Sequence, residues 1–245
     1  MTLRASLPMY TRPELDSANA ALWQAIRDQM WVQGLQAPDA LDPNGFGYAF
    51  WEAPDLLLSQ TCGYPYRTRL SDKVAFIGTP NYGLPDCPPG YYYSVFVVHA
   101  ASPVETLADL TTFAFNARDS QSGFRGPLDY AAQRGVKLQP TLETGSHMAS
   151  AKAVADGKSS VAAIDAITWR NMTTFDRFTN DLKVIARTRP VPGLPLITGQ
   201  ANRVDDIRAI VSNVLANMPA DAAQLGITGL SDLGADDYSA DRFRP

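Results

Sequence analysis

Strand-like and helix-like segments alternate along most of the chain, and this alternation restricts its fold more than any other feature. Apolar runs of strand length stand between turn residues at 3–7, 54–61, 73–80, 91–98, 111–117, 159–165 and 182–188. Apolar residues at helical spacing lie between several of these runs. The clearest helix pattern places Ile207, Ile210, Val211, Val214, Leu215 and Met218 on one face before Pro219. The pattern predicts an α/β protein with helices packed on largely parallel sheets.

The chain has 245 residues, which is enough for one large domain or for two smaller ones. No long flexible linker separates two halves, so two domains would be joined by ordinary extended segments. Residues near 91–98 and 188–198 have this character and are the expected crossings, or hinge strands. We therefore expect a discontinuous lobe of residues 1–95 and 194–245, and a continuous lobe of residues 96–193.

Composition argues against several classes of function. The net charge of −4 gives no reason to expect a nucleic-acid partner. The apolar runs are much shorter than the roughly 20 residues of a membrane-spanning helix. Two histidines and two cysteines do not favour a metal cluster. We expect neither a metal nor a cofactor.

Two further features leave alternatives open. Cys62 and Cys87 would form a disulfide in an oxidising compartment, or they are two unrelated thiols. Residues 1–10 contain no apolar core of a secretory signal, so the sequence is either the mature part of an exported protein or that of a cytoplasmic one.

Two loops between a strand and a helix have residues suited to an anion. Residues 120–123 read SQSG, and residues 144–147 read TGSH. The first turn of a helix offers unpaired N–H groups and a partial positive charge, and hydroxyl side chains add donors. Plain helix capping explains the serines equally well. The run GSHMAS resembles the remnant of an affinity tag, but the helix pattern continues through it to Gly157, so we interpret it as part of the fold.

Other residues at strand ends are weaker candidates. Asp165 ends an apolar strand and lies either at the same edge as the two loops or at the start of a helix from Ala166, as its cap. Tyr93 belongs to the first expected crossing, and Tyr92 points away from it if the segment is a strand. Asp16 or Ser17 is the expected cap of a helix that closes at Gly34.

Taken in order, these segments resemble the substrate-binding proteins of phosphonate and phosphate ABC transporters, the PhnD-type group. The resemblance covers nearly the whole chain. It rests on a hydroxyl-rich S-x-S-G after a strand, then TGSH, then a strand that ends in an acid at Asp165. The family implies a two-lobed α/β fold of the type II periplasmic binding class. Each lobe is then a mixed, mostly parallel sheet flanked by helices, and the ligand binds in the cleft between the lobes.

The resemblance also implies a set of ligand-binding residues: Tyr10, Thr61, Gly63, Tyr64, Tyr93, Ser120, Gln121, Ser122, His147 and Asp165. By this resemblance, Ser120, Gln121 and Ser122 would hold the phosph(on)ate group, with His147 beside them. Two departures weaken phosphonate specificity. Gln121 stands where many relatives have Thr, and the second crossing lacks the acid that several aminophosphonate binders carry.

The expected function is that of a monomeric, non-enzymatic binding component. It captures a small anionic ligand by hinge closure and delivers it to an ABC transporter permease, in the periplasm. The alternatives are a cytoplasmic sensor on the same fold, or an enzyme with Cys62 as nucleophile and His147 or His99 as base.

Overall fold

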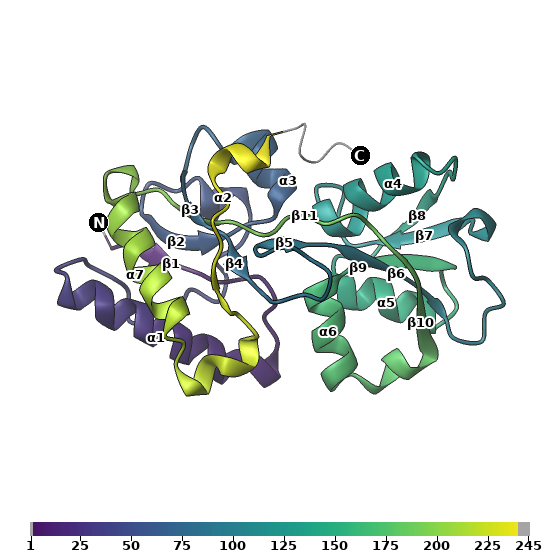
Figure 1. Ribbon diagram of the computed structural model, residues 1–245, viewed down its shortest axis with the longest axis horizontal. Helices are drawn as coiled ribbons and strands as arrows, with labels where there is room; N and C mark the ends of the chain where they lie inside the picture. Colours follow the sequence, from purple (N-terminus) through teal and green to yellow (C-terminus); the bar gives the residue numbers. More distant parts are fainter. Residues whose placement is uncertain (1, 240–245) are drawn as a thin grey trace. The chain divides into compact units, whose positions relative to one another are not determined.

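The structure is a computed structural model that describes residues 2–239, and the chain forms two compact units (Figure 1). Unit 1 contains residues 2–85 and 192–239, and unit 2 is Asp86–Val191. The boundaries between the lobes expected from the sequence lie at 95/96 and 193/194. The boundaries between the two units lie at 85/86 and 191/192. Residue 1 and residues 240–245 of the expected first lobe lie outside the described residues.

Unit 1 is built on a four-stranded sheet of order β1-β2-β12-β3. These strands are β1 (Arg4–Ala5), β2 (Leu56–Gln60), β12 (Leu196–Thr198) and β3 (Ala75–Gly78). β1 runs parallel to β2, while β12 is antiparallel to both of its neighbours. Two short strands, β4 (Pro80–Asn81) and β13 (Gly229–Leu230), form a separate antiparallel pair. Every residue of β2 is buried, including the polar Ser59 and Gln60 that follow its three leucines.

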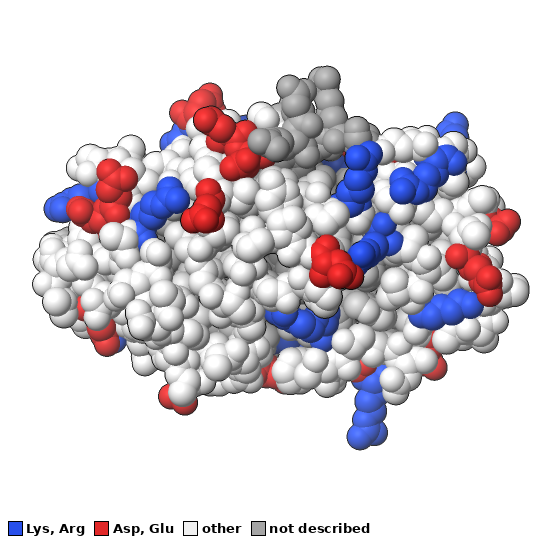
Figure 2. Space-filling model, viewed as in Figure 1, with Lys and Arg blue, Asp and Glu red and all other residues white. Residues whose placement is uncertain are grey.

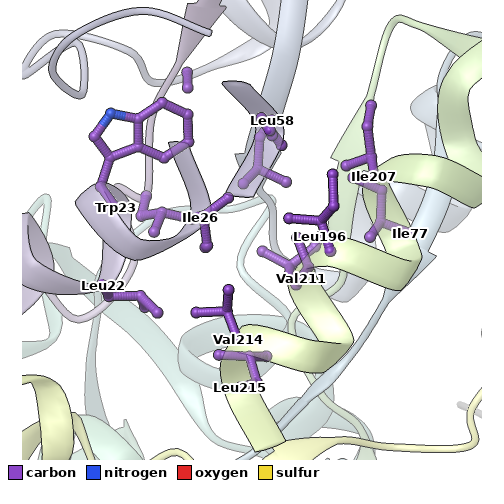
Figure 3. Packing of buried hydrophobic residues seen from close by; sticks show 14 of the residues in the cluster. Leu22, Trp23, Ile26, Leu58, Ile77, Leu196, Ile207, Val211, Val214 and Leu215 are labelled. Atoms are coloured by element: carbon purple, nitrogen blue, oxygen red, sulfur yellow. The ribbon is translucent and has the colours of Figure 1, made fainter. Parts of the chain in front are cut away.

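The helices of unit 1 are α1 (Asp16–Val32), α2 (Tyr48–Trp51), α3 (Gly63–Pro65) and α7 (Val204–Ala216). A π-helical turn, Tyr66–Leu70, continues α3, and short 3-10 turns lie at Pro13–Leu15, Ala201–Arg203, Ala220–Leu225 and Ala235–Tyr238. α1 and α7 share one apolar cluster with the sheet, in which Leu22 and Ile26 of α1 point toward Val211 and Val214 of α7 (Figure 3). Burying each such side chain contributes about 1.5–3 kcal/mol.

The expected cap of the first helix is wrong. α1 begins at Asp16 and its cap position is Leu15, which makes no side-chain capping bond. A 3-10 turn that starts at Pro13 leads directly into the helix, and Asp16 N–H donates to Pro13 O. The backbone of this turn therefore does what a capping side chain would otherwise do. Gly34 follows the helix with φ +73°, the left-handed conformation that ends helices.

Unit 2 is built on a five-stranded sheet of order β10-β6-β9-β7-β8. These strands are β10 (Leu182–Arg187), β6 (Ser94–His99), β9 (Val161–Asp165), β7 (Thr112–Phe115) and β8 (Gln139–Glu143). β9, β7 and β8 are parallel, whereas β6 runs antiparallel to β9 and β10. Two short strands, β5 (Tyr91–Tyr92) and β11 (Val191–Pro192), lie close to the passages of the chain between the units.

Helices cover both faces of this sheet. α4 (Gly126–Ala132) lies on one side, and α5 (His147–Ala155) and α6 (Ala166–Phe175) lie on the other (Figure 1). A π-helical turn, Gln121–Arg125, leads into α4, and 3-10 turns occupy Leu107–Asp109 and Arg177–Asp181. The core contains Phe96, Phe113, Phe115 and Phe124, all buried.

The sheets are mixed, but less parallel than expected. Within the two larger sheets of residues 2–239, three strand pairings are parallel (β1-β2, β7-β8, β7-β9) and four are antiparallel (β2-β12, β3-β12, β6-β9, β6-β10). The antiparallel pairings all involve β6 or β12, the strands by which the chain enters a sheet after each passage. β8 is a polar edge strand containing Pro140 that the sequence pattern did not indicate.

Charged side chains of both signs are scattered among uncharged residues over the face shown in Figure 2. Within the described part of the chain, no helix combines the length and the apolar character needed to cross a bilayer.

Candidate functional site

The candidate site of unit 2 lies at one edge of the sheet, where three parallel strands end. β7 ends at Phe115, and its register places Phe115 opposite Glu143, the last residue of β8. β9, on the other side of β7, ends at Asp165. The carboxyl ends of parallel strands are the usual position of ligands in α/β sheets. The loops SQSG and TGSH therefore follow neighbouring strands, although residues 122 and 147 are 25 positions apart in the sequence.

The SQSG segment is held rigidly at this edge. Ser120 caps the following turn, because its Oγ accepts from Gly123 N at 2.9 Å. Ser94 Oγ, on β6, donates to the Ser122 carbonyl at 2.8 Å. Phe124 packs on Phe115 with ring centroids 4.6 Å apart. The capping interpretation of this motif is thus correct for Ser120, while the Ser122 side chain has a different partner.

That partner is His147. Ser122 Oγ and His147 Nε2 are hydrogen-bonded at 3.0 Å, which joins the two predicted anion loops directly. His147 is the first residue of α5, whose cap is Ser146, since Ser146 Oγ accepts from Ala149 N at 3.1 Å. The backbone N–H of Thr144 donates to Phe115 O at 2.9 Å and so attaches the loop to the end of β7.

The environment of His147 keeps its imidazole neutral. Burial of the ring lowers the pKa of His147 to about 4, and a backbone interaction with Ala163 opposes this shift only in part. The Nδ1 atom is buried and forms no hydrogen bond to any residue in 2–239. A neutral imidazole hydrogen-bonded to the Ser122 hydroxyl can orient an anion without adding a full charge.

Asn116 is a residue of this site that the sequence pattern did not single out. It directly follows β7, and its carbonyl accepts from Gly145 N at 3.0 Å. Its side-chain oxygen is buried against Gly123, and a Cβ atom at residue 123 would overlap Asn116 Oδ1 and lie 3.0 Å from His147 Cε1. Its position could have indicated it, because Asn116 is a polar residue at the carboxyl end of the apolar strand TFAF.

Asp165 and Tyr93 lie near the same edge of the sheet, and each forms contacts that stabilise the fold. Asp165 is buried and caps α6, accepting from Ile167 N at 2.8 Å and from Thr168 N at 3.1 Å. The capping alternative for Asp165 therefore applies. The carbonyl of Tyr93 accepts from Ala166 N, and the Arg187 guanidinium lies 5.2 Å from the centre of the Tyr93 ring. Gln121 is buried beside the two serines.

The remaining predicted residues belong to unit 1. Thr61 follows β2 and is fully buried; its N–H donates to Pro195 O at 3.1 Å, while its hydroxyl has no partner among the described residues. Gly63 and Tyr64 form the short helix α3, and the Arg67 guanidinium lies 4.8 Å from the Tyr64 ring centre. Tyr10 has φ +64°, and its ring packs edge-on against Tyr82.

The cysteines and the second histidine complete the candidate residues. Cys62 and Cys87 are both free thiols in the structure, and burial raises the pKa of Cys87 to about 11. Their pairing in an oxidising compartment stays a prediction. His99 ends β6, and its Nδ1 accepts from Ala101 N at 3.1 Å, which is a turn-forming role. Among residues 2–239, no cluster of three or more His, Cys, Asp or Glu side chains is placed to hold a metal ion.

The family described as "ABC transporter, phosphonate, periplasmic substrate-binding protein" matches residues 55–239, about three quarters of the chain. No curated protein matches the sequence. Among solved structures, PhnD1 of Prochlorococcus marinus in complex with methylphosphonate is similar at a TM-score of 0.76 and 15% identity, covering 96% of this chain and 94% of its own.

Two other structures have the same architecture. A binding protein component of an ABC phosphonate transporter from Pseudomonas aeruginosa has a TM-score of 0.68 at 18% identity, covering 96% of this chain and 82% of its own. A Xanthomonas citri protein bound to ATP has a TM-score of 0.69 at 16% identity, covering 99% of this chain and 94% of its own. At these identities the likeness shows the fold, which is the α/β type II periplasmic binding fold with two mixed sheets flanked by helices.

Proposed function

The chain belongs to the family of periplasmic substrate-binding proteins of phosphonate ABC transporters, and from this premise we propose that it captures a small phosphate- or phosphonate-like anion and delivers it to a membrane permease. The observation that carries the proposal is the hydrogen bond between Ser122 and His147 at 3.0 Å. It joins the two loops whose residues suit an anion, at the sheet edge where ligands bind in this class of fold.

The chemistry of these loops favours a tetrahedral oxyanion. Ser120, Gln121 and Ser122 occupy the start of a turn that continues into α4, where the helix dipole favours negative charge. Ser122 adds a hydroxyl, and His147 orients it. None of these groups needs to change its protonation state when an anion arrives, which suits reversible binding.

The same geometry argues for binding rather than turnover. A Ser–His pair acts as a nucleophile when a carboxylate orients the other ring nitrogen and the imidazole is a competent base. In this site no carboxylate of a described residue is hydrogen-bonded to His147 Nδ1, and burial lowers the pKa of the ring to about 4. The Cys62 alternative has less support, since His99 is engaged with the backbone of its own turn.

The proposal assigns the second part of the site to unit 1. Thr61 is its best-supported residue, because a fully buried hydroxyl without a partner in the described chain is costly and is expected to gain one. Tyr10, Gly63 and Tyr64 belong to the same proposed set, as do Tyr93 and Asp165 of unit 2. Periplasmic location and a permease partner follow from the family and are part of the proposal.

A thermal-shift panel tests the function directly. The panel contains phosphate, phosphite, methylphosphonate, 2-aminoethylphosphonate, sulfate and acetate, on protein unfolded and refolded to remove bound ligand. A true ligand at 100 times its Kd adds about 2.7 kcal/mol of stability, which raises the Tm by roughly 5–10 °C in a chain of this size.

The variant Ser122→Ala localises the effect. We expect it to weaken binding of the stabilising anion by about 1–3 kcal/mol, the usual cost of leaving a buried charged acceptor without its donor. Ser102→Ala, in a half-buried turn of the same unit outside the proposed site, serves as the control. A panel without any shift would contradict the proposed ligand class, and an unchanged affinity in Ser122→Ala would remove this loop from the site.

A further inference from the structure

Three groups of unit 2 lie close together: the Asn116 amide and the Cα atom of Gly123, both in the segment after β7, and the His147 ring at the start of α5. A Cβ added at residue 123 would overlap Asn116 Oδ1, lie 2.7 Å from Asn116 Cγ and lie 3.0 Å from His147 Cε1. The backbone of Gly123 does not have a positive φ, so its conformation is open to any residue. Glycine is therefore required at this position by the close approach of its neighbours.

The Asn116 side chain is unusual in a second respect. Its Oδ1 is buried and forms no hydrogen bond within the described chain. A buried acceptor without a donor costs free energy, so such an atom needs an explanation. An apolar side chain at this position would carry no such cost.

The backbone of Asn116 links the same segments. Its carbonyl accepts from Gly145 N at 3.0 Å, in the loop that leads to His147. The preceding carbonyl, of Phe115, accepts from Thr144 N at 2.9 Å and from Thr144 Oγ1 at 3.1 Å. Asn116 thus fixes the TGSH loop through its backbone and contacts the SQSG loop through its side chain.

We propose that Asn116 is the positioning residue of the anion site: its amide, seated on Gly123, holds the His147 ring so that Nε2 meets Ser122 Oγ. In this role the side chain must be short, planar and polar, because it fills the narrow space between a glycine and an imidazole edge. The part of this inference that concerns ligand affinity rests on the proposed function. The part that concerns the pose of His147 does not.

Complementary variants test the positioning role. Gly123→Ala introduces the overlapping methyl group, and Asn116→Ala removes the group it overlaps. We expect Gly123→Ala to lower the affinity for phosphate or methylphosphonate, measured by calorimetry, at least tenfold, and Asn116→Ala to lower it several-fold. The double variant should bind within about threefold of Asn116→Ala, because the space for the methyl group then exists. Such non-additivity is the signature of direct contact.

The pose of His147 is measured separately, without ligand. The protein has two histidines, so His99→Gln identifies which imidazole C–H signal in the NMR spectrum belongs to His147. We expect the chemical shift of that signal to change in Gly123→Ala. In the double variant, the shift should lie close to the value found in Asn116→Ala. Gly234→Ala, where a Cβ meets nothing within 4 Å and φ is not positive, is the matched control.

Each outcome decides a specific point. An unmoved His147 signal in both Gly123→Ala and Asn116→Ala would overturn the positioning role, whether or not any anion binds. A double variant that binds as weakly as Gly123→Ala would also overturn it. If wild-type protein binds neither phosphate nor methylphosphonate while the His147 signals move as expected, the positioning role stands and the proposed ligand class fails. If Gly123→Ala does not fold, Asn116→Ala alone supplies both measurements.

Discussion

His147 illustrates how a single residue links burial, charge and stability. Its folded-state pKa of about 4 lies below the ordinary value of 6.5 because burial disfavours the imidazolium ion. Between about pH 4 and pH 6.5, the unfolded chain therefore binds a proton at His147 that the folded chain does not bind. Stability is therefore complete above about pH 6.5 and falls as the pH drops toward 4, by up to about 3 kcal/mol.

Urea unfolding at pH 4.5 and pH 7 measures this effect. We expect the free energy of unfolding to be lower at pH 4.5 in the wild type, and the difference to shrink in His147→Gln, which has no titrating ring. A variant that keeps the full difference would show that other groups cause it and that the imidazole is not buried in its neutral form.

At the scale of elements, one buried tyrosine helps to attach the C-terminal segment of unit 1, in addition to the pairing of β13 with β4. Tyr238 Oη donates to Gly193 O at 2.8 Å and lies 2.7 Å from Thr79 Oγ1. Its ring packs edge-on against Tyr66, with centroids 5.1 Å apart. Burial raises the pKa of Tyr238, so the hydroxyl stays protonated and available as a donor. The segment that ends in Tyr238 is thereby attached to Thr79, between β3 and β4, and to Gly193, where the chain re-enters unit 1.

Removing this hydroxyl should therefore destabilise unit 1. We expect Tyr238→Phe to lower the free energy of unfolding by about 1–2 kcal/mol, because two buried hydrogen-bonding groups lose their partner. Tyr130→Phe, at a partly exposed site, is the comparison. Equal stability of the two variants in urea would mean that Gly193 and Thr79 find other partners easily and that the tyrosine acts only through its ring.

At the scale of the whole molecule, the two compact units and the family membership lead to a prediction about motion. The chain passes between the units after Pro85 and again after Val191. We expect ligand binding to bend these passages and close the units on each other, the hinge mechanism common in this class of fold. Small-angle X-ray scattering should then show a smaller radius of gyration with the anion identified by the thermal panel. An unchanged scattering curve at saturation would contradict hinge closure.

The sequence by itself determined the features that depend on neighbouring residues. Apolar runs and helical spacing identify most strands and helices, because each pattern repeats within a few residues. Serines before helices identify the two anion loops for the same reason. Local patterns failed where the backbone replaced a side chain, as at the start of α1, and where a strand is polar and lies at an edge, as in β8.

The tertiary structure decided what depends on contacts between distant segments. The register of β7 against β8 brings the SQSG loop to the TGSH loop, and thus Ser122 to His147. The turn after β7 brings Asn116 against Gly123. The insertion of β12 between β2 and β3 makes the first sheet mixed. Such pairings gain their free energy from burial and hydrogen bonds made only after the chain has folded back, and no short stretch of sequence encodes them. The sequence therefore predicts the residue types of the candidate site, while only the tertiary structure shows how they are arranged.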